Sequence, residues 1–278
     1  MSSLVHNRPR SQRATELPRD AAAPQGLVGG IIFDWVISLL GLVFVSGAYL
    51  DGWAHNHDRV DQSFFTPWHA FLYGGFLVIA LILVGTLWTN HRRGVAWSRA
   101  LPVGYSLSML GALVFAAGGV GDLLWHEIFG VEAEFDALFS PTHLVLAIGM
   151  NLMITGPMRA AWARPAHRLT WQTGGPAILS LTALICGFTF LMMASHPLVA
   201  NIAGATHDYG DRIGQIAGTV SLILTTILLL GPTLLAMRRW QLPAGALIVA
   251  WGINTLAMFI INWQHSYAPW QALAMFIA

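Results

Sequence analysis

The chain of 278 residues is 55% hydrophobic and only 10% charged, with a mean hydropathy of +0.60. Soluble domains usually carry about 25% charged residues, so this composition excludes a soluble domain and predicts an integral membrane protein in a lipid bilayer. The formal net charge is +1, and all 14 basic residues are arginine. The single cysteine, Cys186, excludes an intrachain disulfide framework and any cysteine-based metal site. We expect no nucleic-acid partner.

Residues 1–26 form a polar segment that contains four arginines among proline, alanine and serine residues. No short apolar core with a cleavage site can be distinguished there from the long apolar stretch that follows, so a secretory signal is not indicated. The segment is predicted to be a disordered, arginine-rich tail.

Residues 27–278 contain seven apolar stretches that approach or exceed the length of about 20 residues needed to span a bilayer. These stretches are residues 27–50, 67–89, 100–123, 141–162, 176–195, 213–237 and 242–264. We therefore expect an all-α fold, a polytopic transmembrane helical bundle of about seven spans. A shorter apolar run that ends at Ala278 predicts part of an eighth helix.

The arginines predict the orientation in the membrane, because cytoplasmic loops are enriched in basic residues. Twelve of the 14 arginines lie in the tail and in the second, fourth and sixth loops. The N-terminus is therefore predicted to be cytoplasmic, in what we expect to be a bacterial inner (plasma) membrane. Most aspartates, glutamates and histidines lie in the opposite loops, which are predicted to be extracytoplasmic.

The spans group into tandem helical hairpins, each with an outer loop rich in Asp and His and an inner loop rich in Arg. The expected pairs cover residues 27–89, 100–162, 176–237 and 242–278. The third pair keeps only a degenerate form of the outer pattern, with His196, His207 and Asp208, and the fourth keeps His265.

The second pair carries the clearest candidate site. Asp122 and His126 are four residues apart, so on a helix they lie on one face. Ser140-Pro141 predicts a helix start, with serine as N-cap and proline at the first helical position, which places His143 in the first turn. The three side chains are expected to meet at one end of a hairpin.

The first pair repeats this pattern. Asp51 and His55 are again four residues apart, and Thr66-Pro67 precedes His69 as Ser140-Pro141 precedes His143. One carboxylate and two imidazoles suit copper, zinc or iron and leave a coordination position open. The two trios therefore predict metal sites, with Asp61, Glu127 and Asp136 as candidate acceptors for the remaining ring N–H groups. The alternative is a hydrogen-bonded cluster without metal that caps the helix ends.

The run from Asp122 to His126, followed by Asp136-Ala-Leu-Phe-Ser-Pro-Thr-His143, resembles the copper-site motif in the C subunit of the particulate methane and ammonia monooxygenase family. The run from Asp51 to His69 resembles the same motif a second time, with its second histidine 14 positions after the first, where the spacing in the other copy is 17. The resemblance implies copper ligands at Asp122, His126 and His143 and at Asp51, His55 and His69. It also implies partner subunits, one of them with a periplasmic cupredoxin domain.

We therefore expect a copper-dependent oxidoreductase or monooxygenase-like subunit that acts on a small apolar or ammonia-like substrate, with partner subunits or as a homo-oligomer. Two other interpretations stay open. The chain could be a copper or zinc permease, chaperone or sensor without redox catalysis, or it could bind haem through two histidines. Whether the two trios form two separate centres, one shared centre, or one working site and one vestigial site is also open.

Overall fold

The structure is a computed structural model, and it describes residues 26–57, 59, 64–130, 138–196 and 212–261. Within these ranges the chain is helical, and a single backbone bridge joins Arg168 to Gln241. The helices, in chain order, are α1 (Ile31–Asn56), α2 (Pro67–Arg92), η1 (Trp97–Arg99), α3 (Ser106–Phe129), α4 (Pro141–Ile154), α5 (Gly156–Trp162), α6 (Trp171–Leu191), η3 (Met193–Ser195), α8 (Arg212–Arg239) and α9 (Ala246–Ile261).

Five of the described helices are long and apolar enough to cross a membrane, namely α1, α2, α3, α6 and α8. The pair α4 and α5 adds a sixth span if it crosses as one broken helix, bent by 43°. Helix α9 has 16 described residues and is shorter than each of the five long helices. The structure thus confirms a helical membrane protein, but with five or six such spans in its described part where the sequence predicted seven. The expected tail and partial eighth helix lie outside the described residues.

The bend between α4 and α5 departs from the continuous helix expected over residues 141–162. The Thr155 hydroxyl donates to the Asn151 carbonyl at 2.7 Å, and the Arg159 guanidinium donates to the Leu152 carbonyl at 2.9 Å. Pro157, directly after Gly156, has no N–H with which to continue the helical ladder. These bonds occupy carbonyls at the end of α4 and hold the bend.

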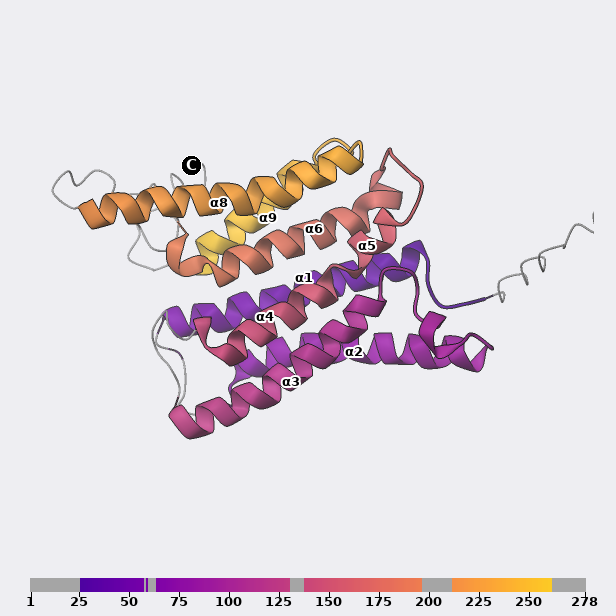
Figure 1. The fold of residues 1–278 in the computed structure, drawn as a ribbon, viewed down its shortest axis with the longest axis horizontal. Coiled ribbons are helices and arrows are strands. Elements are labelled where there is room, and N and C mark those ends of the chain that lie inside the picture. Colours follow the sequence, from indigo (N-terminus) through magenta and orange to yellow (C-terminus); the bar gives the residue numbers. More distant parts are fainter. Residues whose placement is uncertain (1–25, 58, 60–63, 131–137, 197–211, 262–278) are drawn as a thin grey trace, which may run out of the picture.

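Helix α1 lies inside the bundle, packed against α2 on one side and α6 on the other (Figure 1). Helices α3 and α4 form the second tightly packed hairpin, and α9 and α8 pack against α6. The α3–α4 contact depends on glycine, because a Cβ added at Gly149 would lie 2.6 Å from the backbone nitrogen of Phe115. This close approach sets the spacing between the two helices that carry the second trio.

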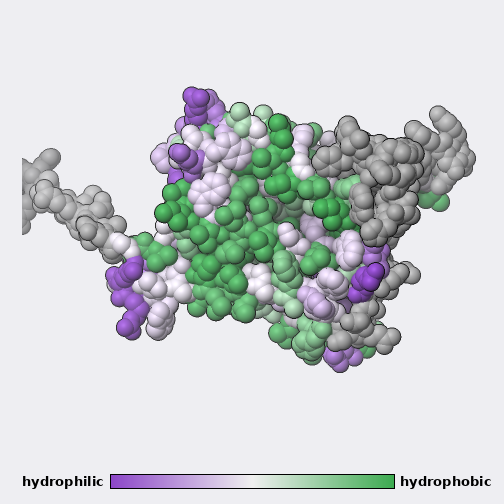
Figure 2. Space-filling view, turned by 180° about the vertical axis from the view of Figure 1, so that it is seen from behind, coloured by the Kyte–Doolittle hydropathy of each residue, from purple (hydrophilic) through white to green (hydrophobic). Residues whose placement is uncertain are grey.

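The face of the bundle seen in Figure 2 is apolar across its middle and hydrophilic toward both ends. Large aliphatic side chains point outward from several helices, for example Ile32, Ile213 and Ile248, each at least three-quarters exposed. An apolar band with outward-pointing aliphatic side chains is what contact with lipid requires.

At the end of the bundle opposite the trios, a buried carboxylate contacts side chains from two other parts of the chain. Asp34 of α1 is 1% exposed, accepts a hydrogen bond of 2.7 Å from the Tyr105 hydroxyl and forms an ion pair with Arg164. Asp34 therefore joins α1 to the start of α3 and to the α5–α6 connection, and its isolated charge in the sequence has a structural explanation.

Candidate metal centre

The first trio, which we call site A, consists of Asp51, His55 and His69. Asp51 and His55 lie in the last two turns of α1, and His69 lies in the first turn of α2. As predicted, Thr66 caps α2, and its hydroxyl accepts a hydrogen bond of 3.1 Å from the backbone N–H of His69. The carboxylate of Asp51 lies 3.4 Å from His69 Nε2 and 4.0 Å from His55 Nε2.

The second trio, site B, consists of Asp122, His126 and His143. Asp122 and His126 lie near the end of α3, and Ser140 caps α4 so that His143 lies in its first turn. Asp122 Oδ1 lies 3.3 Å from His143 Nε2 and 3.7 Å from His126 Nε2. In each site one nitrogen or oxygen atom per residue lies within 4.8 Å of the others, so the convergence expected from the spacing is present twice.

Backbone carbonyls orient one histidine in each site. His69 Nδ1 lies 2.6 Å from the Phe64 carbonyl, and His126 Nδ1 lies 3.3 Å from the Gly130 carbonyl. A carbonyl can only accept, so each Nδ1 carries the proton, and in a neutral ring Nε2 then presents a lone pair to the carboxylate. The tautomer that a metal ligand needs is therefore already set.

The sequence predicted carboxylates for this orienting role. Glu127 is exposed, and Asp61 and Asp136 lie outside the described residues. The observed acceptors for His69 and His126 are main-chain oxygens instead, which no side-chain motif could indicate.

The separations between carboxylate and imidazole suit an ion better than a direct hydrogen bond. Charge-assisted N–H···O bonds have lengths of about 2.7–2.9 Å, whereas the four pairs here are separated by 3.3–4.0 Å. Two ligand atoms about 2.1 Å from one tetrahedral ion lie about 3.4 Å apart. A lone pair that faces a carboxylate is also repulsive unless a cation or a proton lies between them.

Burial increases the need for a cation. The Asp122 side chain is 2% exposed, and the neutral Thr142 hydroxyl donates a hydrogen bond of 3.0 Å to its Oδ1. In site A, Asp51 Oδ1 is buried and has no hydrogen-bond partner among the described residues. A buried carboxylate without a compensating charge costs several kcal/mol by the usual order of magnitude. A positive charge in each trio would remove this cost.

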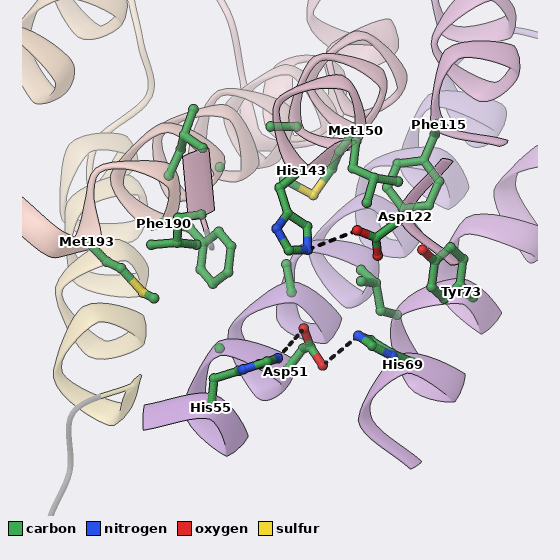
Figure 3. A pocket seen from close by; sticks show the side chains of 18 of the residues that line it. Asp51, His55, His69, Tyr73, Phe115, Asp122, His143, Met150, Phe190 and Met193 are labelled. Atoms are coloured by element: carbon green, nitrogen blue, oxygen red, sulfur yellow. Dashed lines mark ion pairs between the residues drawn. The ribbon is translucent and has the colours of Figure 1, made fainter. Parts of the chain in front are cut away.

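Both sites border one cavity of about 480 Å³ (Figure 3). Five of the six trio residues line it, all except His126. The remaining wall is largely apolar and includes Leu72, Phe115, Leu146, Met150, Phe190 and Met193. The cavity therefore brings together two charged centres and a hydrophobic surface of the kind that binds small molecules.

Sequence reasoning missed two polar residues of this region. Tyr73 lines the cavity and lies four residues after His69, so helical spacing alone could have placed it on the same face. Thr142, which donates to Asp122, lies between the Ser140 cap and His143, where only the cap and the histidine were considered.

The accessory histidines do not join the sites in the described part of the chain. His196 is buried, and this burial lowers its pKa to about 4, so its ring is neutral at pH 7. It is not among the residues that line the cavity. His207 and His265 lie outside the described residues.

Compared with family models, curated proteins and solved structures, the chain matches none of them. The function of the two sites therefore has to be inferred from their own geometry.

Proposed function

We propose that the protein is a membrane metalloprotein that binds copper at sites A and B, and that it acts as a copper-dependent oxidoreductase or as a subunit of one. The observation that carries the proposal is the repeated geometry of one carboxylate and two imidazoles, with ligand atoms separated by 3.3–4.0 Å. Zinc or iron would fit the same donors. The motif resemblance to the C subunit of the methane and ammonia monooxygenases favours copper.

In this proposal each aspartate neutralises part of the charge of the ion, and the histidines fix its position. The Phe64 and Gly130 carbonyls hold His69 and His126 with Nε2 toward the ion. Three protein ligands leave a coordination position open, so bound copper would supply one-electron redox chemistry next to the cavity. The apolar wall would hold a small substrate and exclude water from that position.

We also propose a larger arrangement. The resemblance supports partner subunits, and a homo-oligomer is the alternative. The apolar stretches of the sequence support tandem hairpins with seven spans in total, and the distribution of arginines supports a cytoplasmic N-terminus. The matching positions of Asp51 and Asp122, and of His69 and His143, at the ends of successive hairpins support a duplication of the first pair.

Metal analysis of the purified full-length protein tests the proposal. We expect two copper ions per chain in the wild type and one in His69→Ala or His143→Ala, because each variant removes one ligand from one site. His167→Ala is the matched control, since His167 is exposed and contacts Arg239 at the other end of the bundle. Equal copper content in the wild type and both ligand variants would overturn the proposal.

One observation favours a second candidate, a metal-handling protein without redox catalysis. The side chains of His143 and His55 are 26% and 22% exposed, so an ion could exchange with the surroundings. Dialysis of the loaded protein against a copper chelator separates the two functions. A fixed catalytic centre should retain its copper for hours, whereas a carrier or chaperone should release it within minutes.

A further inference from the structure

Among the described residues that line the cavity, Tyr73 is the one that carries a hydroxyl, and it shares the lining with both carboxylates. Its hydroxyl oxygen is buried and has no hydrogen-bond partner among the described residues. Figure 3 shows Tyr73 together with both aspartates in the lining of the cavity.

The ring of Tyr73 is held firmly. It packs against Phe64 and Phe115, with 5.7 Å between ring centroids in each case. On another side, a Cβ added at Gly119 would lie 2.8 Å from the Tyr73 ring. The hydroxyl therefore cannot turn away freely to find another partner, and a buried hydroxyl without one is unfavourable by about 1–3 kcal/mol.

The charges in the cavity indicate what the partner would be. Among the described residues that line the cavity, the acidic side chains are Asp51 and Asp122. Two divalent ions and these two aspartates together carry a net charge of about +2 next to an apolar wall, where charge is poorly screened. Sites A and B share this cavity, since Asp51, His55 and His69 line it together with Asp122 and His143.

We propose that the space between sites A and B binds one small anion, such as hydroxide or azide, and that the Tyr73 hydroxyl donates a hydrogen bond to it. The anion offsets the excess positive charge and supplies the acceptor that Tyr73 lacks. Tyr73 is then a positioning residue and not a metal ligand. This inference rests on the proposed metal binding, and its test separates the two.

The test uses full-length protein loaded with Cu²⁺ in detergent, with copper content measured first and azide as the probe. Azide binding is followed by the charge-transfer absorption of the copper–azide complex. Tyr73→Phe keeps the ring and removes only the hydroxyl, so copper content should stay at two ions while azide affinity falls at least about tenfold. The control is Tyr49→Phe, whose hydroxyl is buried away from the cavity and bonds to the Cys186 carbonyl at 3.0 Å.

Two results would overturn the inference. Unchanged azide affinity in Tyr73→Phe would show that the hydroxyl does not hold the anion, and loss of copper in this variant would show that Tyr73 acts on the metal instead. The single-site variants His69→Ala and His143→Ala test whether one anion is shared by both copper sites. Each variant should bind azide more weakly at its remaining copper ion. Unchanged azide affinity at that ion would mean that the two sites bind anions independently. Absence of copper from the wild type would contradict the proposed function itself.

Discussion

Asp51 and Asp122 occupy equivalent positions, but their surroundings differ. The Asp122 side chain is 2% exposed and that of Asp51 is 15% exposed. Asp122 also accepts a hydrogen bond from Thr142, which fixes the orientation of its carboxylate. We therefore expect site B to be the more rigid and the more strongly binding of the two.

Asp122→Asn should weaken copper binding at site B about 10–100-fold, because the asparagine side chain keeps the shape of the aspartate but lacks its negative charge. The metal-free variant should unfold at the same temperature as the metal-free wild type or higher, since no buried charge remains to be compensated. The copper-induced rise in unfolding temperature should be smaller than in the wild type. Copper titration and thermal unfolding measure both effects.

Asp51→Asn is the matched control, because it should affect site A and leave the affinity of site B intact. The same copper affinities in Asp122→Asn and the wild type would show that Asp122 is not a ligand.

At the scale of single residues, the sequence was sufficient to predict both trios. Spacing of four residues places Asp and His on one helix face, and a Ser/Thr-Pro pair fixes the first turn of the next helix. The orienting carbonyls of Phe64 and Gly130 could not be predicted, because every residue has such a carbonyl. Only the folded loops decide which carbonyl meets an imidazole.

At the scale of elements, each trio depends on how closely the two helices of its hairpin approach. In the second hairpin a Cβ at Gly149 would lie 2.6 Å from Phe115 N, and one at Gly111 would lie 2.7 Å from the Gly149 carbonyl. These are backbone atoms, which cannot move aside without separating the helices.

Gly149→Ala should therefore push α3 and α4 apart and destabilise the protein by about 1–3 kcal/mol. Site B spans these two helices, so its copper affinity should fall, whereas site A, on α1 and α2, should keep its copper. Denaturant unfolding and copper analysis of each variant measure these effects. Gly85→Ala is the control, because a Cβ there would meet nothing within 4 Å. Equal effects of the two substitutions would contradict the role assigned to the glycine contact.

The helix boundaries show where sequence patterns are reliable. The starts at Pro67 and Pro141 were predicted to the residue, because proline and its cap act locally. The bend at Thr155 was missed, since it depends on Arg159 bonds that only the folded bundle provides. The start of α6 at Trp171 precedes the predicted residue 176, because a Thr170 capping box continues the helix into polar sequence.

At the scale of the whole molecule, composition was enough to predict a helical membrane protein but not its number of spans. Hydropathy cannot distinguish a straight span from the bent α4–α5 pair. It also could not show that two hairpins bring their trios to one cavity, because that depends on how α1–α2 packs beside α3–α4.

Cysteine labelling tests the proposed orientation in the membrane. The native Cys186 is buried, so a labelling reagent should react only with an introduced cysteine. Glu127→Cys and Arg168→Cys each place a thiol at an exposed position, at opposite ends of the bundle. A membrane-impermeant maleimide should label Glu127→Cys in intact cells and Arg168→Cys only after permeabilisation. The reverse pattern would place the N-terminus outside, and labelling of both in intact cells would contradict the arrangement of the spans.

The most direct measurement is anomalous diffraction at the copper edge from crystals of the copper-loaded protein. Binding at both trios predicts two anomalous peaks, each within about 2.2 Å of one aspartate oxygen and two histidine nitrogens of its site. The proposed copper binding at sites A and B would be contradicted if the peaks lay only at other positions and, within each trio, the aspartate and the histidines were hydrogen-bonded directly to one another.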